Sequence, residues 1–166
     1  MSGAPHPDEI AVEVEIEDER WSAWSSDPAS LAQAAAHAAL AAADRRGGVV
    51  ILLTDDAELA DLNLRFRGKA GPTNVLSFPA SNNALGHLGD IALAAEICQA
   101  EATAQGKGFA HHLQHLVAHG VLHLVGYDHE TEEEALTMEA LERRIMRGLG
   151  APDPYGDDDG AGGDVR

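Results

Sequence analysis

The sequence HGVLHLVGYDH, residues 119–129, overlaps the end of the apolar segment Phe109–Val125 and continues past it. We expect this segment to form the central helix of the fold. A helix turns by about 100° per residue, so His119 and His123 project from the same face one turn apart. Two imidazole nitrogens at this spacing can bind one metal ion. The glycine between the second and third histidines allows the backbone to leave the helix, which brings His129 to the same ion as a third ligand.

Three protein ligands indicate a catalytic rather than a structural metal site. A structural zinc ion usually has four protein ligands, often cysteines, whereas a catalytic zinc ion keeps one position open for water. The chain has a single cysteine, Cys98, which excludes both a thiolate cage and a disulfide within the chain. The sequence therefore predicts one Zn²⁺ ion bound by His119, His123 and His129.

Other histidines of the same helix are interpreted differently. His115 lies one turn before His119, where it is either a hydrogen-bond partner of the site, a base near the metal, or a packed side chain. His111 and His112 are adjacent and point in different directions, so we expect both at the surface where the helix begins.

The residue after the first histidine excludes one class of enzyme. Zinc proteases of the His-Glu-x-x-His type carry their general base at this place, but here the residue is Gly120. A base for a metal-bound water must come from elsewhere or be unnecessary, because zinc alone can lower the pKa of bound water to about 7.

Hydrophobic periodicity predicts an α+β domain with a sheet of about four strands packed against several helices. In the helix that follows Asp55, we expect Leu59, Leu62 and Phe66 to face the core. Strands are expected at residues 10–16, 49–53, 74–78 and 88–93, and helices at residues 28–43, 55–66, 94–105, 109–125 and 131–148.

The length of 166 residues and the 45% hydrophobic content fit a single domain. We assign residues 1–155 to this domain and interpret residues 156–166 as an acidic, glycine-rich disordered tail. No stretch approaches the ~20 apolar residues of a membrane span, and the N-terminus has no signal-like pattern. These features, with the single cysteine, predict a cytoplasmic protein.

Four motifs follow one another along the chain: LNLRFRGK (62–69), PTNVLSFP (72–79), GDI (89–91) and HGVLHLVGYDH (119–129). In this order and spacing the sequence resembles the YbeY family of bacterial endoribonucleases, also called rRNA maturation factors. The resemblance covers about residues 10–155 and is highly specific.

The resemblance implies a zinc-dependent, single-strand-specific endoribonuclease that acts in 16S rRNA 3′ end maturation and in ribosome quality control. It implies RNA, the small ribosomal subunit and assembly factors as partners. It also implies His119, His123 and His129 as metal ligands and catalytic residues, and Arg67 as a further catalytic residue. A guanidinium at this place can contact two phosphate oxygens at once.

The net charge of −17 needs an explanation in a protein that approaches a polyanion. Residues 1–20 carry a net charge of −6 and residues 128–166 carry −8, so the middle of the chain is only weakly acidic. Arg65, Arg67 and Lys69 form the one close basic cluster of that middle part. The cluster is either part of an RNA-binding site or simply a solvated helix end.

Two other functions remain open. The first is a metal-dependent hydrolase of peptides or small molecules, against which the missing glutamate after His119 argues. The second is a noncatalytic protein of ribosome assembly, in which the metal only stabilises the fold. A test of metal-dependent cleavage on single-stranded RNA and on peptides distinguishes the three.

Overall fold

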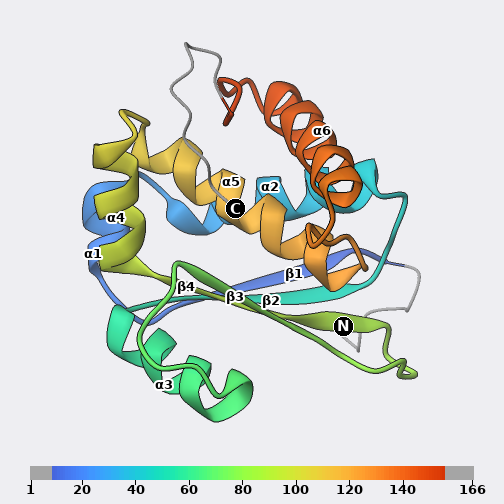
Figure 1. Ribbon diagram of the computed structural model, residues 1–166, viewed down its shortest axis with the longest axis horizontal. Helices are drawn as coiled ribbons and strands as arrows, with labels where there is room; N and C mark the ends of the chain where they lie inside the picture. The colour runs from blue at the N-terminus through green and yellow to red at the C-terminus, as the bar shows by residue number, and fades with distance from the viewer. Residues whose placement is uncertain (1–8, 156–166) are drawn as a thin grey trace, which may run out of the picture.

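The computed structural model describes residues 9–155, which form one α+β domain around a four-stranded sheet (Figure 1). The strands lie in the order β1-β2-β4-β3; β1 pairs with β2 and β2 with β4 in parallel, whereas β3 is antiparallel to β4. The strands are β1 (Ala11–Ile16), β2 (Gly48–Thr54), β3 (Val75–Pro79) and β4 (His87–Ala94). The predicted tail, residues 156–166, lies outside the described residues.

Helices cover both faces of the sheet (Figure 1). Helix α5 is central, since it contacts α2, α4, α6 and the strands β3 and β4. Helix α3 lies on the opposite face (Figure 1). The helices are α1 (Arg20–Trp24), α2 (Pro28–Ala42), α3 (Asp56–Arg67), α4 (Ala95–Ala104), α5 (Phe109–Leu124) and α6 (Glu132–Gly148). Within residues 9–155, no helix has the length and apolar character needed to cross a membrane.

The larger hydrophobic core fills the space between the sheet and helices α2 and α5. Small alanine side chains line the inner face of α2, so its backbone can approach α5 closely. A second, smaller core lies between the sheet and α3, and it contains Leu59, Leu76, Ala92 and Ala94. The predicted fold class, with the histidine cluster at the end of a central helix, is confirmed.

Local sequence signals fix several helix ends. Asp55 accepts a hydrogen bond from the backbone of Glu58 at 2.8 Å, and Thr131 and Glu134 form a reciprocal capping box. Helix α2 ends at Ala42, one residue before the expected end at residue 43.

Two features of the fold differ from the expectations. Phe66 was expected in the core but is 62% exposed, because α3 diverges from the sheet toward its C-terminal end (Figure 1). The short helix α1 was not predicted; its Trp21 is fully buried and donates a hydrogen bond from Nε1 to the carbonyl of Thr54 at 2.9 Å. A single turn of helix has too few residues to show a periodicity.

Candidate metal centre

The structure brings His119, His123 and His129 together. One ligand atom from each ring can be chosen so that all three lie within 4.8 Å of one another. The ring centroids are 4.6 Å apart for His119 and His123, 5.5 Å for His119 and His129, and 5.1 Å for His123 and His129. Gly126, with a φ of 105°, lies in the turn that returns the chain to α5. All three rings are partly exposed, so a substrate can reach them.

Hydrogen bonds fix which nitrogen of two rings faces the centre of the triad. His123 donates from Nδ1 to the carbonyl of Tyr127 at 2.9 Å, and His119 donates from Nδ1 to Oε2 of Glu142 at 2.8 Å. Since a carbonyl and a carboxylate only accept, each Nδ1 carries a proton, and this tautomer of a neutral ring leaves the lone pair on Nε2. Metal-binding histidines usually have such partners, so this donor set fits a divalent transition metal.

The acidic residue before the third histidine acts on the backbone. Asp128 accepts a hydrogen bond through Oδ1 from the amide of His129 at 2.8 Å. This contact indicates a turn-forming role for Asp128, since it fixes the loop backbone rather than an imidazole ring.

A buried carboxylate, Glu142 of α6, lies behind the triad. It accepts hydrogen bonds from His119, from Nε2 of His115 at 2.7 Å, and from the hydroxyl of Tyr155. Burial by itself raises the pKa of Glu142, but the hydrogen bonds from His115 and His119 hold that pKa well below its usual range. The site therefore contains a buried carboxylate anion, Glu142, that accepts hydrogen bonds from three side chains.

The two other members of this cluster are neutral donors. Burial lowers the pKa of His115, although Glu142 opposes the shift, and burial beside Glu142 raises the pKa of the Tyr155 phenol. Neutral His115 and protonated Tyr155 can each give a proton to the hydrogen bond with the carboxylate. Of the three roles considered for His115, the structure supports that of a hydrogen-bond partner behind the site.

The sequence reasoning did not identify Glu142 or Tyr155. A signal for Glu142 was present, because it lies one helical turn from both Met138 and Met146 on the buried stripe of α6. A carboxylate on such a stripe needs a partner. Tyr155 follows the last helix and offered no comparable pattern.

His112 was expected at the surface, and this prediction was wrong. Its side chain is 1% exposed, and Nε2 lies 2.9 Å from Oε1 of Glu101. Helix α4 packs against α5 and carries Glu101 to this position, where Asn74 also donates to it at 3.1 Å. His111 is exposed as expected.

Gly120, the residue after the first histidine, is closely packed. A Cβ atom there would lie 3.0 Å from Cγ2 of Ile91 and 3.2 Å from Oγ of Ser77. The Ser77 hydroxyl also donates to the carbonyl of Gly120 at 3.1 Å. Helix α5 therefore touches strands β3 and β4 at this point, where even a methyl group would press on Ile91 and Ser77.

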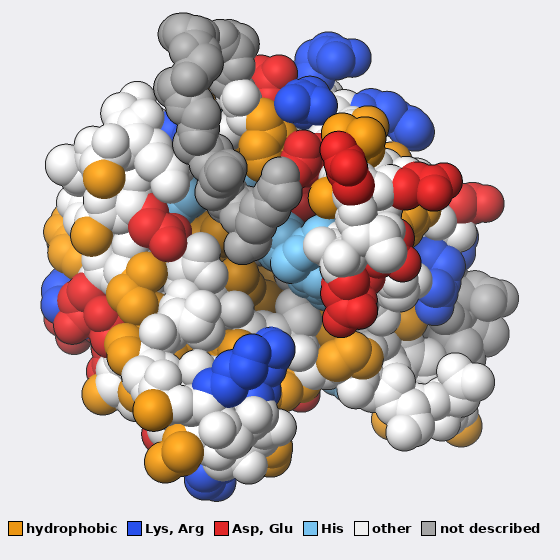
Figure 2. Space-filling view, viewed as in Figure 1, with side chains coloured by type: hydrophobic (Ala, Val, Ile, Leu, Met, Phe, Trp, Pro, Cys, Tyr) orange, Lys and Arg blue, Asp and Glu red, His pale blue; other side chains and the backbone are white. Residues whose placement is uncertain are grey.

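The structure does not bring Arg67 into contact with the histidine triad. Arg67 is the exposed last residue of α3, on the other face of the sheet from α5 (Figure 1). The edge strand β3 lies between them: Ser77 contacts α5, whereas the next residue, Phe78, contacts Phe66 of α3. Figure 2 shows Lys and Arg side chains over the C-terminal part of α3 on the same side of the molecule as the exposed histidines.

Comparisons with known proteins identify the family. The family model described as Endoribonuclease YbeY matches residues 10–150. Two curated relatives, both named Endoribonuclease YbeY, are from Maricaulis maris and Rhodopseudomonas palustris. The first is 48% identical over 150 residues, covering 90% of this chain and 94% of the relative. The second is 50% identical over 155 residues, covering 89% and 82%.

A solved structure supports the fold. The solution structure of TM1509 from Thermotoga maritima is similar with a TM-score of 0.53, covering 91% of this chain and 99% of that protein. At 23% identity this likeness concerns the fold alone. The family match spans most of the described residues, and the curated relatives share nearly half of the sequence at aligned positions. The resemblance of the four sequence motifs is thus confirmed, and the chain belongs to the YbeY endoribonuclease family.

Proposed function

We propose that the protein is a zinc-dependent, single-strand-specific endoribonuclease. In this proposal His119, His123 and His129 bind one Zn²⁺ ion. The enzyme acts in the cytoplasm on rRNA of the small ribosomal subunit, in 16S rRNA 3′ end maturation and ribosome quality control, together with assembly factors. One observation carries the proposal: in a chain of this family, three partly exposed imidazoles converge, and two of them have their Nδ1 protons held by buried or backbone acceptors.

The chemistry that a bound zinc ion supplies is Lewis acidity toward a phosphate oxygen or a water. The chain itself supplies orientation. Glu142 and the carbonyl of Tyr127 hold the His119 and His123 rings with Nε2 directed to the site. Position 120 is a glycine packed against Ile91 and carries no carboxylate, and we assign no general base to the residues of this run.

We assign to Arg67 the stabilisation of phosphate charge. A guanidinium can donate to two nonbridging oxygens and offset the negative charge that builds up in the transition state. Among residues 9–155, neither Arg67 nor Lys69 takes part in an ion pair, so both cations are available to a ligand. Arg67 would reach an RNA strand that passes over the edge strand β3 from the histidine triad to the end of α3.

The experiment that tests the proposal combines elemental metal analysis with cleavage assays. Pure protein should contain about one equivalent of zinc, cleave single-stranded RNA, lose this activity with a chelator, and leave a peptide library intact. Alanine at His119, His123 or His129 should reduce the bound metal well below one equivalent, because two imidazoles seldom hold zinc against water. Alanine at His111, an exposed residue of the same helix, is the matched control and should keep the metal.

The alternative functions give different results in the same assays. Cleavage of peptides but not RNA would favour the peptide hydrolase. One equivalent of metal with no cleavage of either substrate, and a melting temperature that falls on chelation, would favour a stabilising metal. Full metal retention in all three histidine variants would exclude the site.

A further inference from the structure

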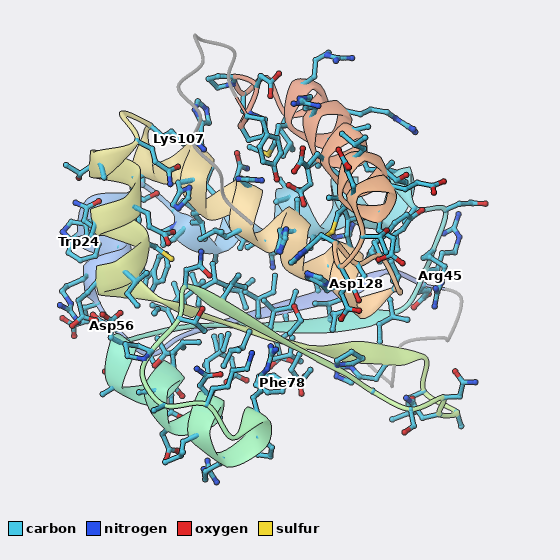
Figure 3. All side chains as sticks on the ribbon, in the orientation of Figure 1. Trp24, Arg45, Asp56, Phe78, Lys107 and Asp128 are labelled. Carbon is cyan, nitrogen blue, oxygen red and sulfur yellow. The ribbon has the colours of Figure 1, made fainter. Side chains whose placement is uncertain are left out.

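An aromatic side chain stands exposed at the C-terminal end of α3. Phe66 is 62% exposed, although a phenylalanine normally gains free energy by burial. Its ring meets Phe78 of the edge strand β3, with centroids 5.7 Å apart and the planes at 70°. This edge contact holds the ring in place. In Figure 3, Phe78 lies on the side of the sheet that faces α3.

An arginine lies beside this ring and two further cations follow it in the sequence, in a chain that is otherwise strongly acidic. The guanidinium carbon of Arg65 lies 5.2 Å from the centroid of Phe66. Arg65 also pairs with Asp61 at 3.0 Å, which fixes its position on the helix. Arg67 and Lys69 follow immediately and are exposed. The net charge of the whole chain is −17, so this cluster is a local exception to its overall charge.

The ring lies across the edge strand from the histidine triad. Ser77 of β3 donates to the carbonyl of Gly120, the residue after His119, and its neighbour Phe78 supports Phe66. Because successive residues of a strand point to opposite faces, β3 connects the two sites through adjacent side chains. A strand of nucleic acid that crossed this edge from the side of α5 would meet the face of β3 that carries Phe78 and, against it, Phe66.

We propose that Phe66 is a stacking platform for an unpaired base of the RNA substrate, with Arg67 and Lys69 contacting the phosphates beside it. The inference rests on the proposed function, and it names a feature that would make the enzyme select single strands. An exposed aromatic face binds a base that is not already stacked and paired, and adjacent cations bind the backbone that carries it. A base within a duplex has no free face to offer.

The stacking platform can be tested by equilibrium binding of a fluorescein-labelled oligouridine. Fluorescence anisotropy follows the binding, and a gel checks that the RNA stays intact. Phe66→Ala should weaken binding roughly 5- to 150-fold, the range expected for the loss of one base–aromatic stack. Phe66→Trp should bind the oligouridine with an affinity within about twofold of the parent protein, because indole also offers a large aromatic face. The melting temperature of both variants should stay close to that of the parent protein, since the side chain is mostly exposed.

A second RNA separates stacking from phosphate contact. An oligomer of the same length without bases should bind the parent protein and Phe66→Ala equally, because its backbone charge is unchanged. Lys69→Ala should instead reduce the steepness of the plot of log binding constant against log salt concentration by about 0.7. Phe66→Ala should leave that slope unchanged. Leu64→Ala is the matched control: Leu64 is 59% exposed on the same helix, but residues two apart in a helix do not share a face.

The results that overturn the inference differ from those that overturn the proposed function. If the parent protein binds oligouridine and Phe66→Ala binds it equally well, Phe66 is not a platform. The same conclusion follows if Phe66→Ala weakens both oligomers to the same degree. If the parent protein binds no single-stranded RNA, the proposed function fails and the inference fails with it.

Discussion

Oε2 of Glu142 lies 2.8 Å from Nδ1 of His119, so a carboxylate of the closing helix α6 orients a histidine of the central helix α5. The carboxylate is fully buried, and His115 and Tyr155 occupy its other oxygen. The packing of α6 on α5 is therefore part of the metal centre, because it decides which nitrogen of His119 faces the triad.

We expect Glu142→Gln to weaken zinc binding about 10- to 100-fold with the fold retained. The amide keeps the size of the side chain but replaces one acceptor by a donor, which then faces a histidine donor. Competition with a chromogenic chelator measures the affinity. Glu133→Gln, an exposed change on the same helix, is the control and should have no effect. Unchanged zinc affinity in a folded Glu142→Gln protein would contradict the orienting role.

Arg67→Ala should reduce RNA cleavage by roughly a hundredfold or more, the effect expected when a donor that stabilises charge is removed. Zinc content and melting temperature should be unchanged, because the side chain is exposed and makes no ion pair among the described residues. Arg67→Lys should recover little, since a point charge cannot make the two-pronged contact. Single-turnover cleavage measures the effect.

Arg45→Ala removes an exposed arginine elsewhere on the surface, away from Phe78 in Figure 3, and serves as the control for Arg67. Cleavage by Arg67→Ala at the parent rate would exclude the phosphate contact. Loss of zinc or of the fold in that variant would instead indicate a structural role.

Gly120→Ala should lower the free energy of unfolding by about 1–3 kcal/mol, because the new methyl group overpacks Ile91 and Ser77. Gly148→Ala is the opposite case, because Gly148 lies in helix α6 and an added Cβ would have no atoms within 4 Å. This substitution should raise the free energy of unfolding by about 0.4–1 kcal/mol. Chemical denaturation of both variants measures the difference. Equal stability of the two would show that α5 can move away from the sheet at no cost.

We expect a chain that stops after Tyr155 to keep its melting temperature and zinc content, since the composition of residues 156–166 offers no large apolar side chains for packing. A chain that stops after Asp153 should melt roughly 5 °C lower. It lacks the Tyr155 hydroxyl that contacts Glu142 and the carbonyl of Pro154 that accepts from Nζ of Lys107 at 2.8 Å. Thermal melting of both proteins tests the boundary; a large loss in the longer one would place part of the tail in the domain.

The sequence by itself determined the features that depend on near neighbours in the chain. The spacing of His119 and His123 follows from the pitch of a helix, and a glycine at position 126 allows the turn that returns His129. The capping box of Thr131 likewise needs only residues three apart. Such features are encoded locally, so they could be predicted without knowledge of the packing.

The tertiary structure decided the features that depend on which elements meet. Glu142 and His112 acquired their partners only because α6 and α4 pack on α5, and neither partner is near in sequence. Phe66 has the periodicity of a core residue, yet α3 diverges from the sheet at its end and leaves the ring exposed. Periodicity shows which face of a helix is apolar, but the length and angle of contact with the sheet decide how much of that face is buried.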